Sequence, residues 1–359
     1  MYREFKLIER IEALFSDADS LDPAAAGKHG VRVGIGDDCA VLEPGAFDLI
    51  STDTLVEGVH FRRDWSSAED IGFKAIAVSL SDVAAMGGRA GAFLLNLSFP
   101  PDLEKPFIDG LLLGLKQACD LFRPEKFYIN PIGGDVTSTS GPMMITTTAL
   151  GSSTPGGALL RSQAQIGDRV FITGPTGLSH AGLDILLDGG EEVAYPALLR
   201  AHRRPYPRVL EGAVIGASGL AGAMVDTSDG LIQDLGHICS ASNVGARIFL
   251  DRLPRHPELI AYCEQFSDEK KLFRYLLGGG EDFQLCFSVP ERHIDELQRI
   301  MQHERSRDGA DGGADCSPGT NWELFEIGEI IDPVEGVSVV DAQGEKFQLD
   351  SVGYEHFAP

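Results

Sequence analysis

The sequence lacks the two commonest nucleotide-binding signatures. It has no Gly-x-x-x-x-Gly-Lys-Ser/Thr run, the mark of a P-loop. It also has no Gly-x-Gly-x-x-Gly run after an expected strand, which a dinucleotide-binding domain would carry. These absences exclude two large classes of nucleotide-dependent enzymes, so any phosphate-binding residues must follow another pattern.

Signs of export or membrane insertion are also missing. The six cysteines form no Cys-x-x-Cys pair, so a reduced protein without zinc or redox motifs is expected. The first 15 residues are charged and amphipathic, unlike a signal peptide. No apolar run reaches the length that spans a bilayer. We therefore predict a cytoplasmic protein with no membrane partner.

Basic residues are scarce. The 30 Lys and Arg residues are outnumbered by 54 Asp and Glu residues, which gives a formal net charge of −24. Nucleic acids and anionic membranes require surfaces rich in Lys and Arg, so neither is expected as a main partner. Small phosphate compounds are compatible with this charge where metal ions cancel the local field.

The length and pattern of the chain predict two domains. Its 359 residues, 43% of them hydrophobic, can build two substantial cores. Strands alternate with helices, which predicts an α/β (α+β) fold with mixed sheets and helices on their faces. A Gly-rich junction places the boundary between residues 1–151 and residues 152–359. Residues 305–320 are rich in Gly and Asp and predict a mobile loop.

Hydrophobic periodicity gives the expected elements. Strands are expected at residues 31–35, 48–52, 92–99, 128–132, 143–150, 169–173, 223–226, 246–250, 284–289, 325–331, 336–341 and 346–349. Helices are expected at residues 5–15, 67–88, 103–122, 178–188, 195–202, 207–217 and 291–304, and a further helix directly after Gly230. Pro131 has no backbone N–H, so the strand that contains it is expected at a sheet edge.

Two acidic clusters lie between Gly34 and Phe61. They are Asp37-Asp38 and Ser51-Thr52-Asp53, each at an expected strand end, and a Pro44-Gly45 turn could fold one beside the other. Carboxylates placed close together repel, and protons or a cation must relieve the repulsion. Asp and hydroxyl oxygens suit Mg²⁺ better than zinc or copper. Two solvated Asp-rich turns are the alternative.

Acidic residues recur in four further places. Asp82 lies inside an expected helix, where Asp has poor propensity and needs a partner. The other clusters are Gly133-Gly134-Asp135, Asp226–Asp229 and Gly280-Glu281-Asp282. Glycine lets the backbone approach a phosphate closely, and Asp can hold the Mg²⁺ that bridges phosphate oxygens. Six clusters in one chain favour a multi-metal phosphate site.

Eight segments resemble the thiamine-monophosphate kinase family. They are GIGDDCAV, STDTLVEGVHF, FKAIAVSLSDVAAMGG, GGDVTST, LLRSQAQIGD, DTSDGLIQDLGHI, GGGEDFQLCF and GYEHFAP, and the resemblance extends from about Phe5 to the last residue. The wider superfamily includes aminoimidazole ribonucleotide synthetase, selenophosphate synthetase and the hydrogenase-maturation dehydratase. The resemblance implies a two-domain ATP-binding fold and a homodimer built from strands of the N-terminal domain. It also implies phosphoryl transfer from ATP to thiamine monophosphate, assisted by several Mg²⁺ ions.

The resemblance assigns roles by position. The residues implied as the Mg²⁺ shell are Asp38, Ser51, Thr52, Asp53, Asp82, Asp135, Asp226 and Asp229. The implied ATP contacts are Gly134, Asp135, Arg161 and Ser228. The implied substrate contacts are His60, Tyr354 and, from the GGED segment, Asp282. Asp53, Asp135 and Arg161 are expected to be the catalytic residues.

The chemistry of such a reaction agrees with these residues. The nucleophile would be a phosphate oxygen, which is largely ionised near pH 7, so no strong general base is required. The sequence shows no His/Ser catalytic constellation. Mg²⁺ and Arg161 can neutralise the two anionic reactants and align them for direct transfer.

Other interpretations stay open. His60 can be an ordinary strand-end histidine, Arg161 a surface arginine and Tyr354 a tail residue that packs on the core. A selenophosphate synthetase carries a reactive Cys or selenocysteine near its N-terminus, whereas Cys39 lies inside the metal motif here. The hydrogenase-maturation enzyme carries a C-terminal Cys, whereas this chain ends in Pro359. A catalytically silent nucleotide or metal sensor would need the same fold, but every expected carboxylate is present.

Overall fold

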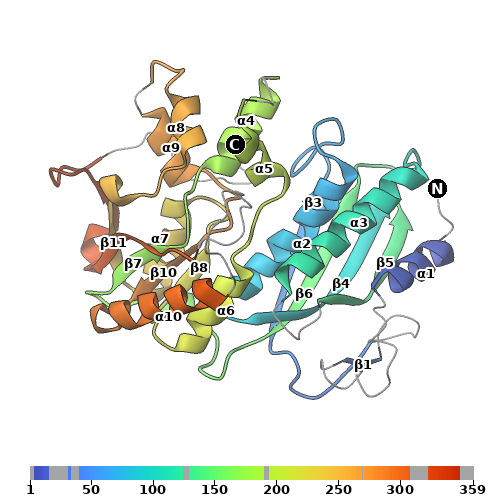
Figure 1. The fold of residues 1–359 in the computed structure, drawn as a ribbon, viewed down its shortest axis with the longest axis horizontal. Helices are drawn as coiled ribbons and strands as arrows, with labels where there is room; N and C mark the ends of the chain where they lie inside the picture. Colours follow the sequence, from blue (N-terminus) through green and yellow to red (C-terminus); the bar gives the residue numbers. More distant parts are fainter. Residues whose placement is uncertain are drawn as a thin grey trace. The chain divides into compact units, whose positions relative to one another are not determined.

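The computed structural model describes residues 4–15, 31–33, 40–123, 129–189, 194–268, 270–307 and 322–347. The chain forms two compact units. Unit 1 comprises Met1–Val83 and Gly88–Ser153, and unit 2 comprises Ala84–Gly87 and Thr154–Pro359. Each unit has a mixed β-sheet with helices packed on it, as Figure 1 shows, which confirms the predicted fold class.

The unit 1 sheet has the strand order β3-β6-β4-β5. Its strands are β3 (Leu49–Val56), β4 (Arg89–Phe99), β5 (Asn130–Ser138) and β6 (Met144–Ser152). Strand β6 pairs antiparallel with β3 and with β4, whereas β4 and β5 are parallel. Two short strands, β1 (Val31–Val33) and β2 (Val41–Leu42), form a separate antiparallel pair.

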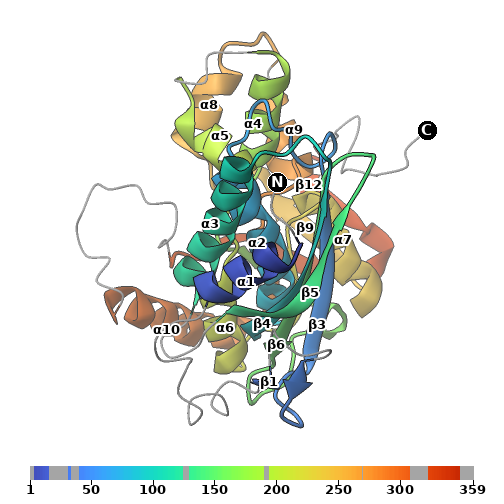
Figure 2. The same cartoon turned by 90° about the vertical axis from the view of Figure 1, so that its right-hand side faces the viewer.

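Three helices lie on one face of this sheet: α1 (Glu4–Phe15), α2 (Ala68–Ala85) and α3 (Lys105–Phe122). Helices α2 and α3 run side by side across the strands (Figure 1), and Figure 2 shows all three on the same side. Strand β4 alternates accordingly, because Phe93 and Leu95 are buried whereas Leu94 and Asn96 are exposed. The face opposite the helices exposes side chains of β3, β4 and β5.

Strands β3 and β5 are longer than the sequence predicts. Strand β3 continues through Asp53 to Val56, and Gly133-Gly134-Asp135 lies inside β5. The expectation that these motifs lie at strand ends is therefore wrong. Cross-strand hydroxyl contacts, such as Thr54 Oγ1 to Thr146 Oγ1 at 2.8 Å, extend the pairing of β3 past Asp53. Tertiary pairing thus overrides the low strand propensity of Asp.

The prediction from Pro131 is confirmed. Strand β5, which contains this residue, is an edge strand of the unit 1 sheet. The pairing register with β4 shifts between Phe93 and Leu94, next to the proline. An edge position tolerates the missing N–H because one side of the strand has no partner strand in the sheet.

The unit 2 sheet has the order β12-β9-β11-β7-β10-β8. Its strands are β7 (Arg169–Ile172), β8 (Met224–Asp226), β9 (Gly245–Phe249), β10 (Leu285–Val289), β11 (Phe325–Ile331) and β12 (Val337–Val340). Strands β9 and β12 are parallel, and the other neighbours are antiparallel. The buried rings of Phe171 and Phe287 stack between β7 and β10, with centroids 5.9 Å apart.

Seven helices are described in unit 2. They are α4 (Leu178–Leu187), α5 (Pro196–Arg203), α6 (Val209–Ser218), α7 (Leu231–Ser242), α8 (Pro257–Cys263), α9 (Lys271–Gly278) and α10 (Ile294–Arg307). Helices α8 and α9 were not predicted, because seven or eight residues give too short a periodic pattern. Helix α10 continues to Arg307, so the first three residues of the predicted 305–320 loop are helical. Residues 308–320 lie outside the described residues. Within the described part of the chain, no helix has both the length and the apolar character needed to cross a membrane.

Candidate active site

The first carboxylate cluster lies between β3 and α2 in unit 1. The side chains of Ser51 and Asp53 alternate with exposed residues of β3 and face the helices. Ser51 Oγ donates a hydrogen bond to the carboxylate of Asp82, inside α2. The structure therefore brings together three residues that the family resemblance placed in one metal shell. The side chain of Thr52 lies on the opposite face of the sheet.

The electrostatics of this cluster favour a bound cation. Burial is the main cause that raises the pKa of Asp53 to about 6, and the nearby carboxylate of Asp82 adds to it. A hydrogen bond from Ser79 partly opposes this rise in the pKa. Asp53 Oδ2 is buried and has no hydrogen-bond partner among the described residues. The same is true of Thr147 Oγ1, on the residue of β6 that pairs with Asp53. Unsatisfied buried oxygens beside two carboxylates fit a metal ion that prefers oxygen ligands, such as Mg²⁺.

Asp135 is not part of this cluster within unit 1. It is exposed, and it pairs with the exposed Asn96 on β4, so both side chains lie on the face away from the helices. Gly134, just before it, has a φ of +149°, and a Cβ there would lie 1.9 Å from the Leu95 carbonyl oxygen. Only glycine fits this close approach of β4 and β5. The predicted role of Asp135 in the metal shell stays a prediction.

His60 lies in the turn that follows β3, half-buried. Its Nδ1 accepts a hydrogen bond from the Val56 N–H at 3.1 Å. The neutral imidazole therefore carries its proton on Nε2. The substrate contact predicted for His60 is compatible with this fixed orientation.

A second carboxylate cluster follows β8 in unit 2. Asp226 ends β8 and is buried, and Asp229 lies three residues further on. Their surroundings include Asp234, which sequence reasoning missed, and His237. One ligand atom each from Asp229, Asp234 and His237 lie within 4.8 Å of one another. The signal that could have revealed Asp234 is its place in the first turn of α7, directly after the DTSDG motif.

The pKa of Asp234 is strongly perturbed within this second cluster. Burial, then the charges of Asp226 and Asp229, raise its pKa to about 7. Its Oδ2 accepts the backbone N–H groups of Asp229, at 3.1 Å, and Gly230, at 3.0 Å. The side chain thus fixes the loop that carries two predicted metal ligands, and its raised pKa again indicates a site that favours added positive charge.

The DTSDG loop is joined to the Gly-rich loop that precedes β10. The Glu281 N–H donates to the Ser228 carbonyl at 2.8 Å, and the Phe283 N–H donates to the Thr227 carbonyl at 2.9 Å. Ser228, a predicted ATP contact, therefore lies directly beside Glu281. The structure brings these two sequence motifs together, although they are about fifty residues apart in the chain.

Asp282 and Glu281 have different surroundings. Asp282 is buried and caps helix α4, accepting the N–H groups of Gly177 and of Ser179, the latter at 3.0 Å. Glu281 has a φ of +63°, an uncommon conformation for a residue with a side chain, and its side chain is 28% exposed. Backbone strain of this kind concentrates at functional sites. Glu281 belongs to a predicted acidic cluster but was given no individual role. The substrate contact predicted for Asp282 stays a prediction.

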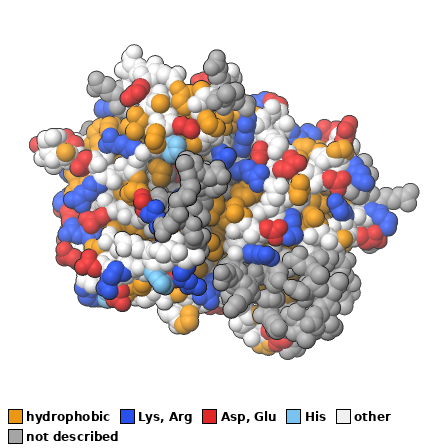
Figure 3. Space-filling model, in the orientation of Figure 1, with side chains coloured by type: hydrophobic (Ala, Val, Ile, Leu, Met, Phe, Trp, Pro, Cys, Tyr) orange, Lys and Arg blue, Asp and Glu red, His pale blue; other side chains and the backbone are white. Residues whose placement is uncertain are grey.

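The remaining predicted residues lie elsewhere. Arg161 is exposed at the start of a short 3₁₀ helix, Arg161–Gln163, whose first carbonyl accepts the Ser242 hydroxyl at 2.7 Å. Asp38 and Tyr354 lie outside the described residues. On the coloured part of the face in Figure 3, Lys and Arg side chains lie among Asp and Glu side chains rather than in one basic stripe.

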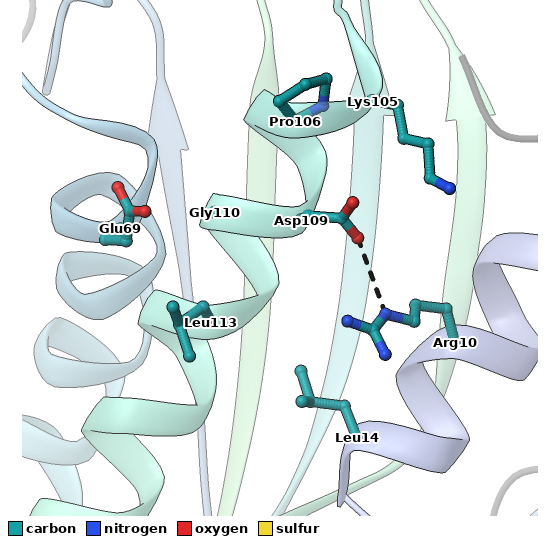
Figure 4. A pocket seen from close by; sticks show the side chains of 8 residues that line it. All are labelled: Arg10, Leu14, Glu69, Lys105, Pro106, Asp109, Gly110 and Leu113. Atoms are coloured by element: carbon teal, nitrogen blue, oxygen red, sulfur yellow. Dashed lines mark ion pairs between the residues drawn. The ribbon is translucent and has the colours of Figure 1, made fainter.

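Two cavities lie away from these clusters. One of about 570 Å³ in unit 1 is lined by residues of α1, α2 and α3, and Figure 4 shows the Arg10–Asp109 ion pair, 3.6 Å long, across it. The cavity residue on α2 is Glu69, which lies 13 residues before Asp82. The cavity is therefore about 20 Å from the carboxylate of α2, measured along the helix. A polar cavity of about 540 Å³ in unit 2 lies near Asp168 and Pro290. Asp168 and Pro290 lie at the ends of β7 and β10 that are farther from Asp226, so this cavity lies away from the second carboxylate cluster.

Comparisons with known proteins agree with the fold. Residues 36–153 match the N-terminal domain, and residues 165–308 the C-terminal domain, of AIR synthase related protein. The chain is 38% identical to the thiamine-monophosphate kinase of Salmonella typhimurium over 99% of this chain and 98% of the relative. It is 32% identical to that of Bacillus subtilis over 94% and 97% of the two chains.

Solved structures give the same result. A crystal structure of thiamine-monophosphate kinase from Stenotrophomonas maltophilia K279a superposes with a TM-score of 0.74 at 34% identity, covering 95% of this chain and 97% of that chain. AaThiL complexed with AMPPCP and TMP superposes with a TM-score of 0.69 at 30% identity, covering 99% of each chain. The hydrogenase maturation protein HypE of E. coli shares the fold, with a TM-score of 0.70, at only 17% identity. The chain belongs to the thiamine-monophosphate kinase family.

Proposed function

We propose that this enzyme transfers the γ-phosphoryl group of ATP to thiamine monophosphate, yielding thiamine diphosphate and ADP. The observation that carries the proposal is the 38% identity to a thiamine-monophosphate kinase along 99% of the chain. A relative with 30% identity was solved with AMPPCP, an ATP analogue, and TMP. Both findings concern the whole chain, so they support the same substrates here.

The two carboxylate clusters supply the sites that Mg²⁺ ions would occupy. In unit 1, Ser51, Asp53 and Asp82 would hold metal, because Asp53 Oδ2 is a buried oxygen without a hydrogen-bond partner among the described residues. In unit 2, Asp226, Asp229 and Asp234 form a second group of crowded carboxylates. Bound Mg²⁺ would neutralise phosphate charge and polarise the phosphoryl oxygens.

Other residues would hold the two substrates. Ser228 would contact ATP, and Glu281, which lies beside it, is a better candidate for a substrate contact than the buried Asp282. His60 would contact thiamine monophosphate with an imidazole whose orientation the Val56 N–H sets. Arg161 would add positive charge near ATP. The acceptor phosphate is largely ionised near pH 7, so these residues need to align it rather than deprotonate it.

Direct transfer is the expected route. A phosphate oxygen of the acceptor attacks the γ-phosphorus of ATP, and the bond from that phosphorus to the ADP oxygen breaks. No enzyme side chain is phosphorylated in this sequence of events. A radiolabelled phospho-enzyme that survives denaturation after incubation with ATP alone would contradict it.

We also propose a homodimer that uses the open face of the unit 1 sheet. This face exposes Ile50, at 71%, and Leu94, at 36%, beside threonine side chains of β3. Asp135 lies on the same face, so a second chain there would enclose a predicted catalytic residue. Light scattering coupled to size-exclusion chromatography would test this state, with Leu94→Arg expected to shift the protein to monomer.

Turnover tests the proposed reaction. The protein is incubated with ATP, thiamine monophosphate and Mg²⁺, and thiamine diphosphate is separated by chromatography. Formation of thiamine diphosphate supports the proposal. Hydrolysis of ATP without that product would indicate another reaction of the same superfamily. ATP binding without any turnover would indicate a nucleotide sensor.

A further inference from the structure

The turn that presents His60 is held by backbone hydrogen bonds at both ends. It spans Glu57–Phe61, directly after β3. The Gly58 N–H donates to the Phe61 carbonyl at 2.8 Å, with Gly58 in the left-handed region at a φ of +84°. The His60 N–H donates to the Val56 carbonyl at 2.9 Å. These bonds define the backbone path before any ligand binds.

The Glu57 carboxylate ties this turn to its neighbours. One oxygen accepts from Arg63 Nε, and the other accepts from the Met143 N–H at 3.2 Å. The Glu57 N–H in turn donates to the Met143 carbonyl at 2.9 Å. The first residue of the turn is therefore fixed to the segment that leads into β6.

Lys74 fixes the other end of the turn from the core. This lysine lies on α2 and is only 2% exposed, among the largest fully buried side chains that the structure describes. Its Nζ donates to the His60 carbonyl at 3.0 Å. A buried lysine is rare and costs free energy unless its ammonium group is hydrogen-bonded. The hydrogen bond to the His60 carbonyl therefore offsets part of the cost of burying Lys74.

The same helix connects two parts of the candidate site. Lys74 precedes Asp82 by eight residues on α2, which corresponds to about 12 Å along the axis. The helix therefore holds both the carboxylate cluster and the carbonyl of His60. A substrate-binding group that is displaced by about 1 Å loses much of its contact, so a rigid support for His60 has a measurable effect on binding of the acceptor.

We infer that Lys74 is a positioning residue, which fixes the Glu57–Phe61 turn so that the His60 imidazole meets thiamine monophosphate in one orientation. The inference rests on the proposed function and assigns to it a residue that makes no contact with substrate. Lys74 acts through the carbonyl of His60, and the Val56 N–H sets the ring itself.

Steady-state kinetics of Lys74→Met tests the inference. The KM for thiamine monophosphate should rise by about tenfold, the loss expected for one hydrogen bond to a charged group. The KM for ATP should be unchanged and kcat should stay within about twofold, because only binding of the acceptor is weakened. Lys116→Met is the matched control, since Lys116 pairs with Asp120 on the surface of α3. It should leave both KM values unchanged.

A double-variant cycle separates positioning from general destabilisation. In the His60→Ala background, Lys74→Met should cause no further rise in the KM for thiamine monophosphate. A further tenfold rise in that background would show that Lys74 acts elsewhere and would overturn the inference. A similar rise in the KM values of both substrates, together with a similar fall in kcat, would overturn it as well.

A second variant covers the case in which Lys74→Met does not fold. Lys74→Gln keeps an N–H donor on a side chain one bond shorter and should give a KM between those of wild type and His60→Ala. A KM equal to that of wild type in every folded Lys74 variant would overturn the inference while leaving the proposed reaction intact. Failure of the wild type to form thiamine diphosphate would instead count against the proposed function.

Discussion

Burial and the neighbouring carboxylate of Asp82, on α2, together raise the pKa of Asp53, on β3, to about 6. The ionised form of Asp53 is therefore disfavoured in the folded protein without metal. Its Oδ2 has no hydrogen-bond partner among the described residues. Such an arrangement is expected of a site that is stable only when a cation occupies it.

Asp53→Asn should stabilise the metal-free protein. The pKa of Asp53 is raised from 3.8 to about 6 in the folded protein. The stability that protonated Asp53 contributes is therefore lost as the pH rises from 3.8 to about 6. The advantage of the variant over wild type should therefore grow across the same window, toward an upper limit of about 3 kcal/mol. Thermal denaturation without metal measures it, with the exposed Asp251→Asn as control.

Added Mg²⁺ should make the wild type more stable than Asp53→Asn. Wild type should gain unfolding temperature with increasing Mg²⁺ at pH 8, because the ion binds the folded state only, and Asp53→Asn should gain less. Equal gains in the two proteins would show that Asp53 does not hold the ion.

Asp282 should give the protein a pH dependence of its own. Burial raises its pKa to about 7, although the N–H groups of Ser179 and Gly177 favour the charged form. The stability that the neutral form provides is lost as the pH rises from 3.8 to about 7. The unfolding temperature of Asp282→Asn relative to wild type should therefore increase with pH over that range. A difference that is constant or declines with pH would contradict this.

Gly134→Ala should disrupt the pairing of β4 with β5. The new Cβ would lie 1.9 Å from the Leu95 carbonyl oxygen, at a backbone φ of +149° that other residues rarely adopt. We expect a loss of about 3 kcal/mol in the free energy of unfolding and lower activity, because Asp135 shifts with the strand. Gly141→Ala is the control, since its Cβ would meet only Thr139 Oγ1, at 3.6 Å. Denaturant titration of both variants distinguishes this steric effect from a general effect of alanine.

Glu281→Gly should separate stability from function. Glycine adopts a φ of +63° readily, so relief of the strain should offset the loss of the contact between Glu281 and His202 Nδ1, 3.4 Å apart, and stability should hold or rise by up to about 1 kcal/mol. The KM for thiamine monophosphate should rise nonetheless, because the carboxylate proposed to contact substrate is gone. A variant that is more stable and equally active would show that Glu281 has no role in binding.

Much of the fold follows from local patterns in the sequence. The alternation of strands and helices predicted the fold class, and Pro131 predicted an edge strand, because both depend on neighbouring residues alone. The predicted ends of β3 and β5 were wrong. Strand β3 pairs with β6, and β5 pairs with β4, so the acidic motifs lie within the strands. This long-range pairing cannot be seen in the local sequence. Helices α8 and α9 were too short to leave a periodic signal.

The sequence predicted candidate site residues one by one, but not their arrangement in space. The family resemblance placed Ser51, Asp53 and Asp82 in one group, and the structure brings them together. The alternation of strand side chains, which depends on register, separates Thr52 from that group. Asp234 and Lys74 escaped notice because their importance comes from burial beside other charges or carbonyls, which only the folded chain reveals.

The initial rate of thiamine diphosphate formation, measured for wild type and Asp53→Asn over a titration of Mg²⁺, tests the central claim most directly. The account predicts product from wild type that depends on Mg²⁺, and a rate at least about a hundredfold lower from a folded Asp53→Asn at every Mg²⁺ concentration. Wild-type protein that binds ATP but forms no thiamine diphosphate, or a variant as active as wild type, would contradict it.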